Sequence, residues 1–157
     1  MRVLLSAVQP GHVPDYWGSY AIQRFEGHPA SHCASVMRDG TVIDATARYG
    51  VRAWTLDEWL GYQGRVLLDD LSFPAPDEDA GEAWARAQLG KRYDWLALAG
   101  FVLWRDLSSP SRGYCSRLVA GQMLAAGCRM PGRTGRTGVR LVHNIAAARS
   151  QAAALAA

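Results

Sequence analysis

The chain has 157 residues, of which 49% are hydrophobic, and a formal net charge of +3. This composition suits a single globular domain with its own core, and so small a net charge argues against a partner recognised by overall electrostatics, such as nucleic acid or a membrane surface. Three cysteines are too few for the disulfide framework of a secreted protein. Because the chain lacks a signal-peptide core and any apolar run of about 18 residues, we expect a cytoplasmic protein with no membrane span.

The first third of the chain predicts a strand followed by a hairpin. An Arg38-Asp39-Gly40 segment separates two β-type runs, and glycine supplies the positive φ that a tight turn needs. Prolines and glycines mark the loop that follows the first predicted strand. The elements expected here are a strand at 2–8, a loop at 9–18, a short helix or turn at 19–25, and strands at 31–37 and 41–47.

The rest of the chain predicts mainly helices. Thr55 and Glu58 have the spacing of a capping box, and Asp79 and Gly90 mark the start and end of a further helix. The elements expected here are a helix at 55–60, a strand at 65–71, a helix at 79–90, a buried core helix at 93–104, a loop at 106–114, a helix at 115–127, and an alanine-rich, helix-prone segment from 144 onward. We expect one domain over residues 1–145 and an alanine-rich tail over 146–157.

Cys115 is the most informative position for chemistry, because it falls at the start of a predicted helix. The positive end of the helix dipole and the unpaired N–H groups there favour a thiolate and lower the pKa of the thiol. The same N–H groups can stabilise an oxyanion. A plain buried core residue is the alternative interpretation.

His32 and Asp44, on the two hairpin strands, would supply the base for such a thiol and the group that orients the base. A strict two-residue turn pairs Arg38 with Thr41 and places the two side chains on opposite faces. A three-residue loop or a bulge pairs Met37 with Thr41 and places them on one face. The catalytic hypothesis therefore predicts the longer turn.

Other chemistry-bearing residues fit weaker hypotheses. Cys33 points away from His32 in a regular strand, which predicts a small buried residue and not the nucleophile. A metal site would gather His28, His32 and Cys33 with Cys115 or His143, but the His28 to His32 spacing suits zinc only on a helix, so we expect no metal and no cofactor.

A basic segment near the C-terminus contains no acidic residue. Its glycines and proline suggest an extended loop, either solvated or in contact with an anionic partner. Its arginines are Arg129, Arg133, Arg136 and Arg140.

Three segments in this order, ASHCASVMRDGTVIDATARYGV, LGKRYDWLALAGF and YCSRLVAGQMLAAG, resemble the circularly permuted branch of the NlpC/P60 cysteine hydrolases. The closest likeness is to the bacterial and phage-borne group related to YiiX and YebB, within a permuted papain-like clan that includes lecithin retinol acyltransferase-like proteins. The resemblance covers roughly residues 18–128. It implies an α+β fold in which a small antiparallel sheet or partial barrel packs on helices, with the cysteine at a helix N-terminus.

The resemblance also assigns roles to single residues. It carries the base onto His32, preceded by Ser31, the orienting group onto Asp44, and the nucleophile onto Cys115. Tyr114, Ser116 and Ser31 become candidates for the oxyanion site or the cleft. The stretch that leads to the nucleophile matches at Gly90, Tyr93, Asp94 and Trp95.

Two positions depart from the family pattern. Arg117 stands where the family commonly has Glu, which bears on the cleft or on a structural ion pair, and Cys33 stands where a small or branched apolar residue is usual. Neither change removes a catalytic group. The expected function is hydrolysis of an amide bond in a peptide, including cell-wall peptides, through a Cys-His-Asp triad and an acyl-enzyme. Hydrolysis or transfer of lipid acyl esters or thioesters, and a non-catalytic binding or virion-associated module, remain the alternatives, and a phage origin is compatible with each.

Overall fold

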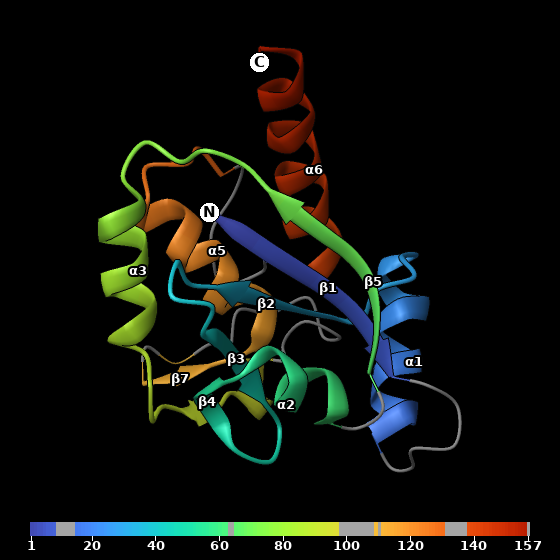
Figure 1. The fold of residues 1–157 in the computed structure, drawn as a ribbon. Coiled ribbons are helices and arrows are strands. Elements are labelled where there is room, and N and C mark those ends of the chain that lie inside the picture. Colours follow the sequence, from blue (N-terminus) through green and yellow to red (C-terminus); the bar gives the residue numbers. More distant parts are fainter. Residues whose placement is uncertain (9–14, 63–64, 98–108, 110, 131–137, 157) are drawn as a thin grey trace.

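The computed structural model describes residues 1–8, 15–62, 65–97, 109, 111–130 and 138–156. The fold is α+β, and its centre is a five-stranded antiparallel sheet with the strand order β4-β3-β2-β1-β5 (Figure 1). The elements are β1 (Arg2–Val8), α1 (Asp15–Glu26), β2 (His32–Val36), β3 (Val42–Thr46), β4 (Gly50–Trp54), α2 (Leu56–Gly61), β5 (Arg65–Ser72), α3 (Glu78–Arg86), β6 (Arg92–Tyr93), β7 (Arg112–Gly113), α5 (Cys115–Ala125) and α6 (Val139–Leu155).

Helices α2 and α5 cover opposite faces of this sheet (Figure 1). Strand residues alternate between the faces, so Leu5 and Cys33 pack with α5 and α6, whereas Leu4 and Ala34 pack with Trp59 of α2. Helix α3 lies beside α5. Both faces of the sheet are therefore buried, and the start of α5 is fixed against the start of β2.

The β2–β3 connection has the longer of the two turns considered above. Ser35 pairs with Ile43, and the Met37 N–H donates to the Thr41 carbonyl at 2.8 Å, which leaves three residues in the loop. Gly40 takes a positive φ of 84°. One step along the ladder, Ala34 lies opposite Asp44, so His32 and Asp44 share a face, as the catalytic hypothesis requires.

Most predicted elements are present, including the strands at 2–8, 31–37, 41–47 and 65–71, the helix at 115–127 and the capping box of α2. Gly127 follows α5 with a φ of 77°. Strand β4 was not expected from the sequence. Helix α1 begins at Asp15, inside the predicted loop, and α3 is capped by Asp77 instead of Asp79 and ends at Arg86, four residues before Gly90.

The predicted core helix at 93–104 is confirmed in part: residues 95–97 are helical, but the helix starts after Tyr93 and is not buried on most sides. Tyr93 belongs to β6, and Trp95 and Leu96 are 57% and 54% exposed. Residues 98–104 lie outside the described part of the chain. Helix α6 runs continuously across the expected boundary at 145 and 146, with Ala146 fully buried. Within the described residues, no helix combines the length and apolar character needed to cross a membrane.

Candidate functional site

Cys115 is the first residue of α5 and is 4% exposed. Tyr114 precedes it as the N-cap residue in an extended conformation and provides no side-chain cap, and the first turn of α5 contains no acidic residue. The N-terminal amide groups and the helix dipole therefore act on the Cys115 sulfur without a competing carboxylate in the first turn of the helix.

His32 and Asp44 form a short, buried hydrogen bond. The distance from His32 Nε2 to Asp44 Oδ1 is 2.6 Å, and the Asp44 side chain is fully buried. This bond fixes the orientation of the imidazole ring and leaves Nδ1 as the nitrogen that can exchange a proton with a thiol. The structure thus joins two of the three residues that the sequence assigned to the site.

The second oxygen of Asp44 has two further partners. Trp59 Nε1 donates to Asp44 Oδ2 at 2.8 Å, and Arg65 Nη2 lies 3.5 Å from the same oxygen. The Arg65 side chain is 2% exposed, and its guanidinium stacks over the Trp59 ring at 4.9 Å. Sequence reasoning missed both residues. The capping box located α2 but gave no sign that Trp59 faces Asp44, and Arg65 reaches the site only because β5 pairs with β1.

The Cys115 thiol lies close enough to Cys33 and His32 for both residues to shift its pKa. The hydrogen bond from the Cys33 thiol is the largest influence and places the pKa of Cys115 well below its ordinary value; burial opposes this shift, and the charge of His32 adds to it. The pKa of Cys33 is raised well above its ordinary value by burial and by its bond to Cys115. Cys115 is therefore the thiolate of the pair, and Cys33 remains a thiol donor.

The His32 and Asp44 ionisations support one another. Burial and the nearby Arg65 would lower the pKa of His32, but the charges of Asp44 and Cys115 outweigh them and the pKa is raised. Burial would raise the pKa of Asp44, yet His32 and Arg65 lower it. The three shifts therefore favour the thiolate of Cys115, the imidazolium of His32 and the carboxylate of Asp44.

A cavity of about 330 Å³ opens beside Cys115, and the three oxyanion or cleft candidates line it. Tyr114 and Ser116 are buried on either side of Cys115 in the chain. Ser31 is also buried, and its hydroxyl is hydrogen-bonded to that of Ser19. The structure thus places all three candidates around the thiol, with Ser31 already engaged by a neighbour.

Comparisons of the chain with models of known protein families, with curated proteins and with solved structures find no match. Function must therefore be inferred from the site itself.

Asp94 organises the chain that leads to Cys115. It is fully buried and accepts hydrogen bonds from the Ala97 N–H at 3.0 Å and the Ser109 N–H at 2.8 Å. Arg117, on the first turn of α5, lies 3.7 Å from Asp94 and donates to the Ser109 carbonyl at 3.1 Å. The arginine that departs from the family pattern therefore has a structural ion pair.

The residues of the metal hypothesis separate into two groups. His32 and Cys33 belong to the site above, whereas His28 Nε2 is 3.0 Å from His143 Nδ1, and His143 Nε2 is 2.9 Å from Asp69. Among the described residues, no group of three or more His, Cys, Asp or Glu side chains is arranged to hold a metal ion. The second group links α6 to β5 and to the segment before β2.

The basic segment is described only in part. Arg133 and Arg136 lie outside the described residues, whereas Arg140 donates to the Glu26 carbonyl at 3.2 Å. The Glu26 carboxylate accepts the Val139 N–H at 3.1 Å and the Arg140 N–H at 2.7 Å. Glu26 thus caps the N-terminus of α6, and Arg140 is committed to an internal contact.

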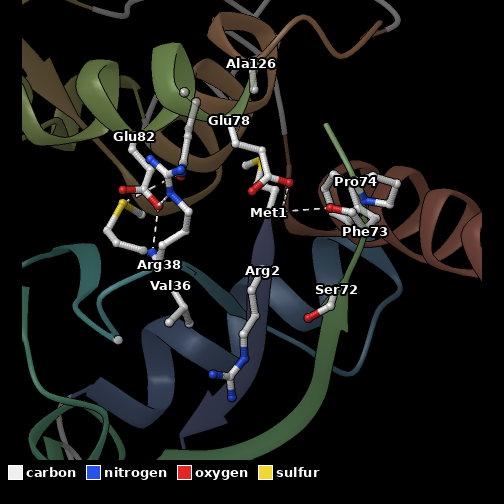
Figure 2. Close-up of a pocket in the computed structure, with 14 residues that line it drawn as sticks. Met1, Arg2, Val36, Arg38, Ser72, Phe73, Pro74, Glu78, Glu82 and Ala126 are labelled. Carbon is white, nitrogen blue, oxygen red and sulfur yellow. Dashed lines mark hydrogen bonds and ion pairs between the residues drawn. The ribbon is translucent and has the colours of Figure 1, made fainter. Parts of the chain in front are cut away.

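A second cavity, of about 530 Å³, has a separate set of lining residues (Figure 2). The Met1 ammonium donates there to Glu78 at 2.6 Å and to the Phe73 carbonyl at 2.8 Å. Arg38 pairs with Glu82 at 3.3 Å. These charges neutralise one another, and none of the lining residues belongs to the Cys115 site.

Proposed function

We propose that this protein is a cysteine hydrolase that cleaves an amide bond through an acyl-enzyme, with Cys115 as nucleophile, His32 as base and Asp44 as orienting group. The observation that carries the proposal is a cysteine at a helix N-terminus without a side-chain cap, whose pKa is lowered by a neighbouring histidine that is itself bound through Nε2 to a buried carboxylate. A fold of the permuted NlpC/P60 type belongs to the same proposal. The antiparallel sheet packed on α5 and the chain order His, Asp, Cys support it.

The acylation step starts from the thiolate and the imidazolium. Cys115 Sγ attacks the substrate carbonyl carbon and forms a C–S bond, and the carbonyl electron pair moves to oxygen. Amide groups at the start of α5 stabilise the oxyanion. The C–N bond then breaks, and the amine leaves with the proton of His32.

Deacylation reverses these roles. Neutral His32 removes a proton from water, whose oxygen attacks the thioester carbonyl. The C–S bond breaks, the acid product leaves, and the thiolate and imidazolium are restored. Asp44 stabilises the imidazolium in both steps and holds the ring in place through Nε2.

The apolar lining of the cavity beside Cys115 favours a second candidate, hydrolysis of an ester or thioester of an apolar acid. The same three residues would act in the same order, with an alcohol or thiol as leaving group. The two candidates differ in the bond that is cleaved and share the acyl-enzyme.

Alkylation by iodoacetamide at pH 6 tests the triad without a substrate. We expect Cys115 to react faster than a free thiol and His32→Ala to slow it at least tenfold, because the imidazolium holds the thiolate. An acyl-enzyme on Cys115 after treatment with p-nitrophenyl acetate, absent in Cys115→Ala, should appear in the intact mass. A Cys115 that reacts like a free thiol and is never acylated would instead favour a non-catalytic module.

A further inference from the structure

A cavity of about 450 Å³ lies between the connection from β3 to β4 and the strands β6 and β7, which contact β4 (Figure 1). Its described lining contains no acidic residue and four cationic ones, which are Arg48, Lys91, Arg92 and Arg112. The aromatic residues of the lining are Tyr49, Tyr93 and Trp95. Because Tyr93 also lines the cavity beside Cys115, this basic cavity is its neighbour, yet it has no part in the proposed reaction.

The arginines of the basic cavity have no acidic partner among the described residues. Arg2, elsewhere on the surface, pairs with Asp70 at 2.6 Å, but no described carboxylate forms an ion pair with the three arginines here. Arg92 and Arg112 are moreover direct partners in the ladder between β6 and β7. Like charges that face one another across neighbouring strands repel, so an anion bound between them would relieve this cost.

Backbone contacts hold the walls of the basic cavity together. The Val51 N–H donates to the Lys91 carbonyl at 2.8 Å, and the Gly90 N–H donates to the Val51 carbonyl at 2.9 Å. Gly50 permits this close approach, because a Cβ at its position would lie 2.2 Å from the Lys91 oxygen. The fold itself therefore forms the cavity and brings the positive charges together.

Two of the four cations already have contacts within the protein. Lys91 Nζ donates to Gln88 Oε1 at 2.7 Å, and the Arg48 guanidinium lies over the Tyr49 ring at 5.4 Å. Arg92 and Arg112 show neither a side-chain hydrogen bond nor an ion pair to any described residue. Their guanidinium groups are therefore the donors that a bound anion would meet.

We propose that the basic cavity binds a small organic phosphate that carries an aromatic ring. A phosphate fits between Arg92 and Arg112, because each guanidinium can donate two parallel hydrogen bonds to it. The ring lies against Tyr49 and Trp95, which are 46% and 57% exposed and bring aromatic surface to the cavity. A concave site of this volume suits a ligand of nucleotide size better than a polymer or a membrane surface.

Calorimetric titration of the full chain with adenosine monophosphate (AMP) tests this proposal. We expect AMP to bind about fivefold or more tightly than ribose phosphate, which lacks the ring. Adenosine, which lacks the phosphate, should bind about tenfold or more weakly than AMP. All titrations are made at one ionic strength, since salt screens the attraction. Adenosine that binds as well as AMP would overturn the phosphate site, and ribose phosphate that binds as well would overturn the ring contact.

Variants at exposed positions locate the ligand. Arg92→Gln should weaken AMP binding about tenfold or more. Trp95→Leu should weaken AMP binding about fivefold and leave ribose phosphate within about twofold. Arg24→Gln removes the same charge from an exposed position of α1 that does not line the cavity, and should change neither Kd. Equal losses in Arg92→Gln and Arg24→Gln would mean that general charge, and not this cavity, attracts the phosphate.

The site and the proposed hydrolase can be tested separately. Cys115→Ala should bind AMP with an unchanged Kd, because the sulfur does not line the basic cavity. AMP binding weaker than millimolar would overturn the site and leave the hydrolase untouched. Vesicles that contain phosphatidylglycerol serve as the alternative probe. If they bind through Arg92 and AMP does not, the partner is a membrane surface and the small-molecule proposal is wrong.

Discussion

Asp44 carries the tightest set of contacts at the site. Its two oxygens lie within 3.5 Å of His32, Trp59 and Arg65, and none of its surface is exposed. A buried carboxylate is tolerated only when such partners replace water. The cluster therefore lowers the pKa of Asp44, and the charge of Asp44 in turn raises the pKa of His32.

Asp44→Asn should lower the pH above which activity is lost. The imidazolium exists below the raised pKa of His32, and loss of the carboxylate charge lowers that pKa, so the alkaline limb of the kcat/KM profile should move to lower pH. Activity at the optimum should fall about 10- to 100-fold, the cost of one charge-assisted hydrogen bond. Asp57→Asn, an exposed change in α2, is the control. An alkaline limb that stays in place would separate Asp44 from the ionisation of His32.

The same ionisations bear on stability. The stabilisation from His32 is fully present below its ordinary pKa of about 6.5 and is lost as the pH rises through its raised folded value. Asp44, whose folded pKa is lowered, contributes stability above its ordinary value, and that contribution is lost as the pH falls through the folded value. The cluster is thus most stabilising at mildly acidic pH.

At the scale of elements, α5 is held in place by close packing against α3. A Cβ on Gly121 would lie 2.1 Å from Trp84 Cη2, and a Cβ on Gly81 would lie 2.8 Å from the Ala126 Cβ. The helices therefore approach through glycines, and any side chain larger than hydrogen pushes α5 and its N-terminal cysteine away from the sheet.

Gly121→Ala should destabilise the protein by about 1–2 kcal/mol, because the overpacking against Trp84 exceeds the gain in helix propensity. Urea unfolding followed by circular dichroism measures this change. Gly61→Ala, in α2, meets no atom within 4 Å and should be neutral or slightly stabilising. A Gly121→Ala protein as stable as the parent would mean that the α3–α5 contact is looser than the structure indicates.

Local signals in the sequence located the hairpin, the capping box and the start of α5, because each depends on neighbouring residues. The three-residue loop could not be predicted outright, since Asp39-Gly40 is compatible with a two-residue turn as well as with a three-residue loop. It was predicted only as a requirement of the catalytic hypothesis. Trp59, Arg65 and the hydrogen bond from Cys33 were missed because they depend on strand order and on helix packing between distant segments. Strand β4 was missed although it pairs with the neighbouring strand β3, because a five-residue segment that begins with Gly50 gives a weak strand signal.

At the scale of the whole molecule, the site joins segments that are far apart in the chain. His32 and Asp44 come from the middle of the sheet, Arg65 from its edge strand β5, and Cys115 from a helix on one face. Apart from the amide groups and dipole of its own helix, every group that lowers the pKa of Cys115 therefore reaches it only in the completed tertiary structure. The site forms only when the sheet and α5 have both folded and docked.

Because residues distant in sequence lower the pKa of Cys115, the reactivity of this thiol reports on folding. Buried thiols ordinarily become more reactive on denaturation, and Cys33 and Cys128, whose pKa values are raised by burial, should do so. Cys115 should do the opposite at pH 6, because in the unfolded chain its pKa returns to about 8.5 and only about 0.3% remains thiolate. Iodoacetamide labelling across a urea titration, with each cysteine resolved by peptide mass, should show its rate falling through the transition while the others rise. A labelling rate that rises at Cys115 would mean that its reactivity comes from nearby residues in the chain. A labelling rate that falls would make the extent of labelling at Cys115 a measure of the folded fraction.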